Sequence, residues 1–522
     1  MQLISKHETS FYALCCIIIG FGLVSSAFLM SLGQILLLMI FLLTGDFQNK
    51  WRTLKQNTPF LLLISLFIIH LLGLTYTIDF ESGVSDIKTK LPILIISLVL
   101  GSIASFSKEL MILILRLFVI AVIVSSLVFI IYFQYQQSKG IVLDSRAIMN
   151  LVKISHIRYS YCIVMALVFC AYDWYENYTL SNYKIFTVNI LTVIWLLFAL
   201  IKLQSFNGFI ALFLIVLGVA VKNAVQHKKL MIPMLLVFTF VGFLVFYAVN
   251  VEYKNFHIKQ YVKKLPQKTM NGNAYTFTQN LFIEFNKYPF SYYCEDELRQ
   301  QWAHKSNVNY EALNLHKTNI FPVLVRYLAF KNLSPDSLGV SKLTPYDIHL
   351  IEQGVSDDYT SHLNPFSKRI YFFIFEFINS EEIGYEGKSL ILKAILWKTG
   401  FQMFINNFWT GAGTGSSKKL FKEKYSEETF LSTFKHCHNQ YLTFGITLGI
   451  IGFVVGSSVL FLSYSYFKPL PIYIVCFLVL IHYAMFTEDM LNTQAGVTFY
   501  MYFNGLFLNH LALKKHATSK KT

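Results

Sequence analysis

Long apolar segments alternate with short polar segments along most of this chain. A run of about 17–25 apolar residues is long enough for a helix to cross a lipid bilayer. Runs of this kind lie near 11–27, 29–44, 59–76, 91–104, 110–133, 158–175, 184–202, 206–222, 229–250, 441–465, 471–487 and 495–513. The pattern predicts an all-α polytopic membrane protein with about twelve transmembrane helices.

One large segment without such runs separates the ninth run from the tenth. We therefore predict an N-terminal membrane domain over residues 1–250 with about nine spans. A mainly helical extracytoplasmic domain would follow over 251–440, and a C-terminal membrane domain with about three spans and a basic tail over 441–522. Within the middle domain, residues 388–405 combine apolar positions at helical spacing with three lysines. This combination indicates a helix that lies in the membrane interface.

The charged residues support a membrane protein and predict its orientation. They make up 14% of the chain, against roughly 25% in soluble domains. The net charge is +15, and Lys and Arg cluster beside the apolar runs, as in 50–55, 222–229 and 514–521. Because positive segments stay in the cytoplasm, both termini are predicted inside and the segment 251–440 outside. With no basic stripe on a soluble fold, nucleic acid is not an expected partner.

The seven cysteines do not form the framework of a small disulfide-rich domain, because five of them lie inside apolar runs. Cys294 and Cys437 lie outside those runs. They could pair in an oxidising compartment, or both could remain free thiols.

The stretch 436–456 begins with polar residues and then enters a span. Gly445, Gly449, Gly452 and Gly456 recur at offsets of four, three and four, which predicts a small-residue face for helix packing. His438 would lie at the outer mouth of that helix. An imidazole there could accept a proton near neutral pH, or could simply form a capping hydrogen bond. Because residues i and i+2 diverge on a helix, His436 and His438 are not expected to share a metal ion.

A family resemblance rests on these residues. His438-Asn439, followed after nine residues by Gly449-Ile450-Ile451-Gly452, matches the pattern of the O-antigen ligase family at each specified position. The turn 411–415 resembles the family's Gly-x-Gly stretch, and 487–491 resembles the segment that opens its last helix. O-antigen ligases, O-antigen polymerases and protein O-oligosaccharyltransferases form this superfamily.

The resemblance implies an inverting glycosyltransferase of the bacterial inner membrane, with its active site on the periplasmic side. The donor would be a glycan linked to undecaprenyl diphosphate, and neither a metal nor another cofactor is implied. An O-antigen ligase would attach the glycan to a hydroxyl of lipid A-core. A polymerase or a protein O-oligosaccharyltransferase would use another acceptor, and these alternatives remain open.

The resemblance also implies roles for residues around the histidine. His438 would be the general base that deprotonates the acceptor hydroxyl. Asn439 and Gln440 would contact the sugar or cap the helix, and Glu488 could orient the imidazole.

The family's diphosphate ligands are arginines, and this chain departs from that pattern. Ser205-Phe206 replaces the family's Ser-Arg, which leaves Lys202 and Asn207 as the nearest polar substitutes. The second arginine corresponds to Lys393, and Arg158 could supply a guanidinium from another helix start. Lys393, Arg158 and Lys202 are therefore the predicted diphosphate-binding residues.

A polyprenyl-glycan transporter is the alternative from a different class. Transporters tend to place charged or broken-helix sites near the bilayer midplane. The predicted spans are almost free of internal charge, and the candidate residues gather at one face. This distribution favours chemistry at the interface, with membrane lipids as the surroundings.

Overall fold

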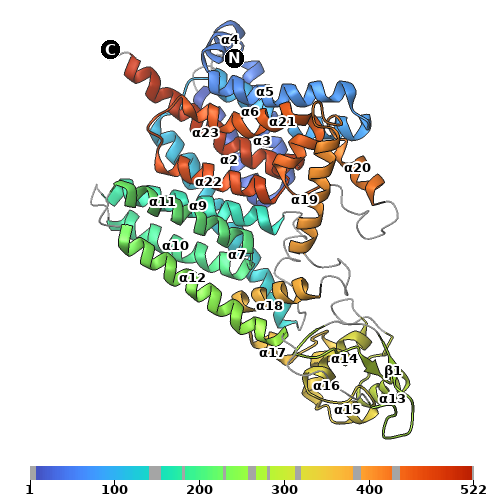
Figure 1. Ribbon diagram of the computed structural model, residues 1–522. Helices are drawn as coiled ribbons and strands as arrows, with labels where there is room; N and C mark the ends of the chain where they lie inside the picture. Colours follow the sequence, from blue (N-terminus) through green and yellow to red (C-terminus); the bar gives the residue numbers. More distant parts are fainter. Residues whose placement is uncertain are drawn as a thin grey trace. The chain divides into compact units, whose positions relative to one another are not determined.

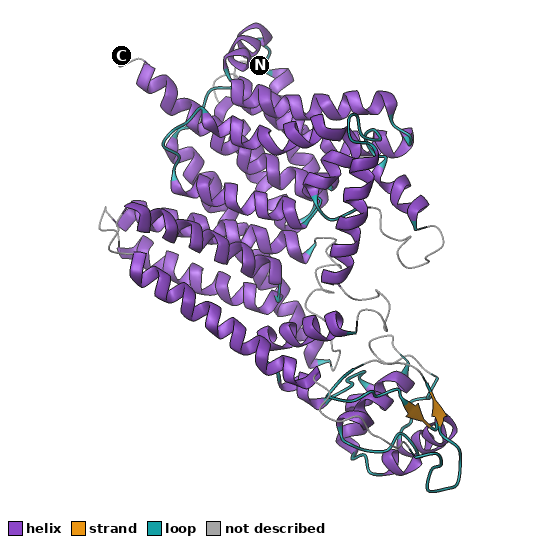
Figure 2. Ribbon diagram, viewed as in Figure 1, coloured by secondary structure: helices purple, strands orange, loops and turns teal. Residues whose placement is uncertain are grey.

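The computed structural model describes residues 8–139, 155–178, 183–226, 231–256, 266–278, 283–311, 319–379, 389–425 and 436–519. These residues are mainly α-helical (Figure 2). The chain divides into two compact units: unit 1 comprises Met1–Lys228 and Lys393–Thr522, and unit 2 comprises Lys229–Leu392. The predicted boundaries at 250 and 440 separate membrane-spanning segments from an extracytoplasmic domain. A division by packing does not test them, so they stay predictions.

Unit 1 is a bundle of long apolar helices with a few short polar ones (Figure 1). Its helices are α2 (Glu8–Ser25), α3 (Ala27–Leu43), α4 (Phe47–Gln56), α5 (Thr58–Gly73), η1 (Leu74–Tyr76), α6 (Phe80–Ser102), α7 (Lys108–Ser138), α9 (His156–Tyr178), α10 (Tyr183–Leu203), α11 (Phe206–Gln226), α19 (Ser389–Asn406), α20 (Ser417–Lys424), α21 (Gln440–Ser465), α22 (Ile472–Thr487), η5 (Met490–Asn492) and α23 (Gln494–Ser519).

Five segments of the described chain are helical, long and apolar enough to cross a membrane: Glu8–Ser25, Thr58–Tyr76, Lys108–Gln136, Phe206–Asn223 and Gln440–Ser465. The bent pair α3 and α4 could form a sixth span. A helix also lies over each of the twelve predicted spans, with α12 (Met231–Tyr253) over the ninth. The described residues are mainly helical, consistent with the predicted all-α membrane protein, whereas the number of spans stays a prediction.

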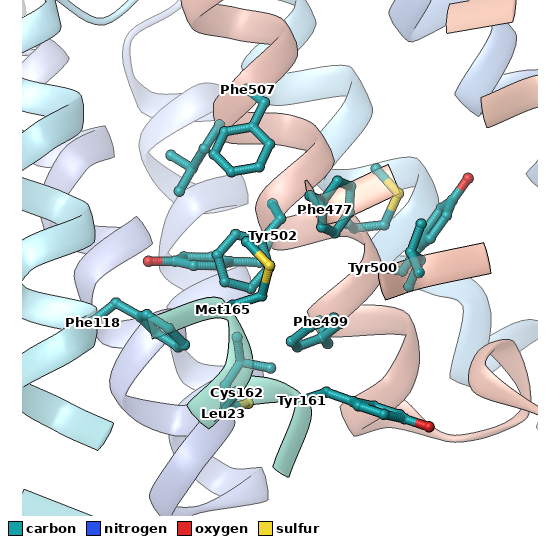
Figure 3. Packing of buried hydrophobic residues seen from close by; sticks show 14 of the residues in the cluster. Leu23, Phe118, Tyr161, Cys162, Met165, Phe477, Phe499, Tyr500, Tyr502 and Phe507 are labelled. Atoms are coloured by element: carbon teal, nitrogen blue, oxygen red, sulfur yellow. The ribbon is translucent and has the colours of Figure 1, made fainter. Parts of the chain in front are cut away.

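The core of unit 1 surrounds α23, which is buried along most of its length between Val497 and Leu511. Figure 3 shows its aromatic side chains among those of α7, α9 and α22. The ring of Tyr502 lies 6.0 Å from that of Phe118, and the ring of Phe507 lies 5.5 Å from that of Phe477. Buried side chains lie on every side of this part of α23, including the polar Asn504 and Asn509. Close packing of its rings therefore makes α23 the centre of the unit.

Residues 80–90 lie between the predicted spans at 59–76 and 91–104, where no helix was predicted. They form the first half of α6 instead. The Asp79 side chain caps this helix by accepting a hydrogen bond from the backbone N–H of Ser82 at 3.0 Å. Hydropathy marks only the apolar half of such a helix, so it could not distinguish a polar helical turn from a loop.

The helix α21 is broken at Gly449, where φ is 64° and ψ is −157°. Almost only glycine adopts this conformation. The break frees backbone groups that a continuous helix would pair, and the turn 411–415 binds them. Ala412 N–H donates to the carbonyl of Ile446 at 2.9 Å, and Gly413 N–H donates to that of Thr447 at 2.8 Å.

The other side of the break is satisfied in the same way, because Ile450 N–H donates to the Phe408 carbonyl at 2.7 Å. Within a membrane an unpaired backbone group is costly, so irregular backbone needs such partners. The predicted small-residue face is therefore not continuous. Gly445 does face the Phe404 ring of α19, but Gly449 interrupts the helix and Gly456 faces the Phe444 ring of α21 itself.

Unit 2 contains α12 and a smaller, mostly helical part with one two-stranded antiparallel sheet. Its remaining elements are η3 (Lys254–Phe256), β1 (Thr276–Phe277), β2 (Tyr292–Tyr293), α13 (Glu295–Lys305), α14 (Ile320–Phe330), α15 (Ser337–Ser341), α16 (Pro345–Glu352), α17 (Asp358–His362) and α18 (Pro365–Ile378). In the sheet, Thr276 pairs with Tyr293. The main hydrophobic core of unit 2 forms around Trp302 and Tyr327, which are fully buried.

Replacing Gly449 by alanine tests the break in α21. The added Cβ atom would collide with the Trp409 carbonyl, and the alanine backbone would have to keep a positive φ. We expect a loss of roughly 1–3 kcal/mol or more in stability, measured as a lower unfolding temperature of the purified protein in detergent. Gly242→Ala is the matched control, because no atom lies within 4 Å of the added Cβ. Equal unfolding temperatures for the two variants would contradict the prediction.

Candidate active site

The backbone at His438 is held by the carboxylate of Asp489, which follows α22. The N–H groups of His438 and Asn439 donate to its two oxygens at 2.8 and 3.1 Å. The Thr443 hydroxyl donates to the same carboxylate at 2.6 Å. His438 has a φ of 53°, so the chain turns sharply just before α21 begins. Asp489 therefore fixes the place from which the imidazole projects.

Asn439 and Gln440 hold the same turn. The Asn439 side chain caps α21 by accepting from the N–H groups of Tyr441 and Leu442, at 3.0 and 3.2 Å. The Gln440 side-chain oxygen accepts from the N–H of Leu491 at 2.8 Å. Both side chains are buried, and these contacts attach the start of α21 to η5. Of the two predicted roles for Asn439, the structure describes a helix cap.

Glu488 lies between His438 and Lys393. One carboxylate oxygen is 3.4 Å from Nδ1 of His438, and the other accepts from Lys393 Nζ at 2.9 Å. Lys393 also donates to the carbonyl of Thr487 at 2.8 Å. The His438 side chain is 36% exposed, compared with 19% for Lys393 and 11% for Glu488. The imidazole is thus the most accessible member of a base–carboxylate–cation row.

The helix α19 lies beside this row and connects it to the turn 411–415. Trp397 Nε1 donates to the carbonyl of His438 at 3.4 Å. The Trp397 ring also packs edge-on against Phe486 of α22, at 4.9 Å between centroids. The predicted interfacial helix over 388–405 corresponds to α19, which carries Lys393 and Trp397 on the side facing the site.

Residues 361–457 match the O-antigen ligase family. The family resemblance predicted from the sequence is confirmed by this match. The matched segment contains α19, the turn 411–415, His438 and the broken part of α21. No curated protein matches the chain. Together with the several apolar helices, the match indicates a multi-pass membrane protein with a glycosyltransferase activity of this general type.

The charges in this O-antigen ligase-like site shift the pKa values of His438 and Glu488 in opposite directions. Burial by itself would lower the pKa of His438. The hydrogen bond to Glu488 and the charge of Asp489 outweigh burial and raise that pKa above 6.5. Burial would raise the pKa of Glu488, but His438 and Lys393 lower it to about 2. Glu488 is therefore ionised at neutral pH and stabilises the protonated imidazole.

Arg158 belongs to the same group of charges. It lies in the first turn of α9, half-buried, within electrostatic range of Glu488 and Asp489. Its Nε atom is buried and has no hydrogen-bond partner among the described residues. Tyr161, one turn later, places its hydroxyl 3.2 Å from the Thr487 hydroxyl. Arg158 thus has a donor available close to the carboxylates that surround His438.

Lys202 and Asn207 have different surroundings. The Lys202 side chain is exposed and lies over the Phe198 ring, with Nζ 5.6 Å from the centroid. No hydrogen bond or ion pair joins it to the His438 group within the described parts of the chain. Asn207 accepts from the Tyr483 hydroxyl of α22 at 3.1 Å. This hydrogen bond ties Asn207 to α22, the helix that ends just before Glu488.

Sequence reasoning missed several residues that the fold brings to the site. Asp489 stood next to Glu488 in the recognised segment 487–491, but nothing in the sequence showed which backbone groups it would hold. Asp86 and Lys90 lie between two predicted spans and were not among the candidate residues, yet Lys90 is 1% exposed. His436 lies beside Asn492, with 3.3 Å between its Nδ1 and the amide nitrogen. The i, i+4 spacing of Asp86 and Lys90 was the signal in the sequence that could have indicated an ion pair on a helix.

Glu488→Gln tests the origin of the raised pKa. Glutamine keeps the shape of the side chain but removes its charge. Burial and the Lys393 charge, which both lower the pKa of His438, then lose their main opponent, and that pKa falls. The ring of the variant becomes neutral at a lower pH, which histidine NMR signals measured across a pH series in detergent would show. Glu423→Gln, at an exposed position of α20, is the control and should leave that pKa unchanged. An identical His438 titration in Glu488→Gln and the parent protein would refute the assignment.

Proposed function

We propose that this protein is an O-antigen ligase that transfers a glycan from undecaprenyl diphosphate to a hydroxyl of lipid A-core at the periplasmic face of the bacterial inner membrane. The observation that carries the proposal is the row His438–Glu488–Lys393, whose histidine and lysine lie in the segment that matches the family, with Arg158 nearby. It combines a base, a carboxylate that orients the base, and cations for an anionic leaving group.

In the proposed reaction, His438 takes the proton of the acceptor hydroxyl as the oxygen attacks the anomeric carbon of the donor. The new bond forms between that oxygen and the anomeric carbon. The bond from the anomeric carbon to the diphosphate oxygen breaks, and its electron pair remains on the diphosphate. A single displacement of this kind inverts the anomeric centre. Glu488 supports the step because it stabilises the imidazolium that forms.

The leaving diphosphate gains negative charge, and fixed cations would stabilise it. Lys393 uses two of its three N–H donors, on Thr487 and Glu488, so one donor is available. Arg158 contributes a guanidinium with a buried Nε. Lys202 is the weakest of the three proposed ligands, since its ammonium group lies over a ring on an exposed face. The amphipathic α19 would guide the polyprenyl chain toward Lys393.

The acceptor is the part of the proposal that a deletion strain tests. Loss of all long chains from lipid A-core indicates a ligase. A single repeat unit left on the core would indicate a polymerase, and unglycosylated secreted proteins would indicate a protein O-oligosaccharyltransferase. Movement of the donor across proteoliposomes without covalent transfer would indicate a transporter.

His438→Ala tests the base. We expect transfer from a defined undecaprenyl-diphosphate glycan to fall by roughly 10²- to 10⁴-fold, because the substitution removes the proposed general base. Transfer by purified protein to lipid A-core measures this loss. His304→Ala, at an exposed position of α13 in unit 2, should retain full activity. Full activity of a normally expressed His438→Ala protein would rule out the mechanism.

Lys393→Met tests the diphosphate site. A charge-assisted hydrogen bond contributes about 1.5–3 kcal/mol, so kcat/KM for the donor should fall by roughly 10- to 100-fold. The assay is run well above the pKa of His438, so that loss of the cation beside Glu488 does not change the protonation of the base. Lys398→Met, at an exposed position of α19, is the matched control. A donor kcat/KM equal to that of the control would exclude Lys393 as a ligand.

A further inference from the structure

A buried ion pair lies in the first half of α6, outside the group that contacts His438. Lys90 Nζ donates to the Asp86 carboxylate at 2.6 Å, and the two side chains are 1% and 15% exposed. Removing two charges from water is costly, and an apolar pair of similar size is often as stable or more stable. Ionisable residues buried in membrane proteins usually have a functional role. Stability alone is therefore a poor explanation for this pair.

The pair is connected to the site through Asn492 in η5. Lys90 Nζ lies 3.5 Å from the side-chain oxygen of Asn492. The amide nitrogen of the same side chain lies 3.3 Å from Nδ1 of His436, two residues before His438. The backbone N–H of Asn492 donates to the carbonyl of Asp489 at 3.2 Å. One asparagine thus contacts both segments that form the site.

Other polar groups face the same layer. His436 lies 3.5 Å from the Ser417 hydroxyl and within electrostatic range of Asp86, Asp489 and Lys418. His70 of α5 lies within range of Asp86 and Lys90. The pair is therefore one of several polar groups that contact or lie near the 436–438 and 488–492 segments.

We propose that the Asp86–Lys90 pair is a positioning element for the transfer reaction. Through Asn492 it fixes the 488–492 segment, so that Glu488 and Asp489 hold the His438 ring in its reactive orientation. The inference rests on the proposed function, because it concerns the orientation of the proposed base. Asp86, Lys90 and Asn492 would be positioning residues, whose effect on the reaction passes through His438.

The segment 488–492 needs such an anchor because it carries both carboxylates that contact His438. Its side-chain and backbone attachments to other elements include the bond from Leu491 to Gln440 and the contact from Lys90 to Asn492. A displacement of about 1 Å at a reacting group can reduce a rate by about 10²-fold. Loss of the Lys90 contact should therefore affect kcat and leave donor binding intact.

The test compares variants of the purified full-length protein in the transfer assay. The variants are Lys90→Met, the double variant Asp86→Leu with Lys90→Met, Asn492→Leu, Asn492→Asp and, as matched control, Lys88→Met on the exposed face of α6. We expect the first three to lower kcat by about 100-fold with donor KM changed by less than about threefold. Asn492→Asp should retain most activity, because its carboxylate still accepts from Lys90 and His436 can donate from its other tautomer.

The double variant keeps the test decisive if Lys90→Met leaves Asp86 unpaired and unfolds the protein. An unchanged unfolding temperature with a low kcat supports positioning, whereas an unchanged temperature with the parent kcat overturns it. A raised donor KM with normal kcat, or an equal loss in Lys88→Met, also overturns it. If the parent protein shows no transfer at all, the proposed function fails. An active parent with an active double variant refutes only the role of the pair.

Discussion

The hydrogen bonds from the backbone of His438 and Asn439 to the Asp489 carboxylate are the interaction on which the site depends. They join the start of α21 to the segment between α22 and α23, two parts of the chain separated by 50 residues. The adjacent Glu488 then reaches the imidazole from the same segment. One pair of neighbouring carboxylates thus fixes both the position of the histidine and the charge beside it.

A second constraint comes from the backbone of α21. A helix in lipid cannot leave backbone groups unpaired, yet α21 is interrupted at Gly449. The turn 411–415 compensates for the interruption with N–H groups that bind the freed carbonyls. Gly449 is therefore explained less by close helix packing than by a break that another backbone segment fills. This arrangement also brings α19, and with it Lys393, close to His438.

The match to the O-antigen ligase family covers 361–457, whereas several charged residues of the site and its surroundings lie outside it. Glu488 and Asp489 follow the matched segment, and Arg158 and Lys90 precede it by two hundred residues or more. The matched part supplies the histidine, the glycine turn and one cation. The surrounding bundle supplies the two carboxylates that act on the imidazole, together with a guanidinium and a buried ion pair farther from it.

The sequence alone determined the elements whose signal is local. Apolar runs predicted helices, and the spacing from His438 to Gly452 predicted the family and singled out the histidine. Glu488 and Lys393 were also named from the sequence, but their contact was not. Tertiary structure decided which residues meet: it buried Lys90, attached Asp489 to the backbone at His438, and left Lys202 over a ring. Hydropathy and spacing report neighbours along the chain, whereas ion pairs and backbone hydrogen bonds between distant helices depend on packing.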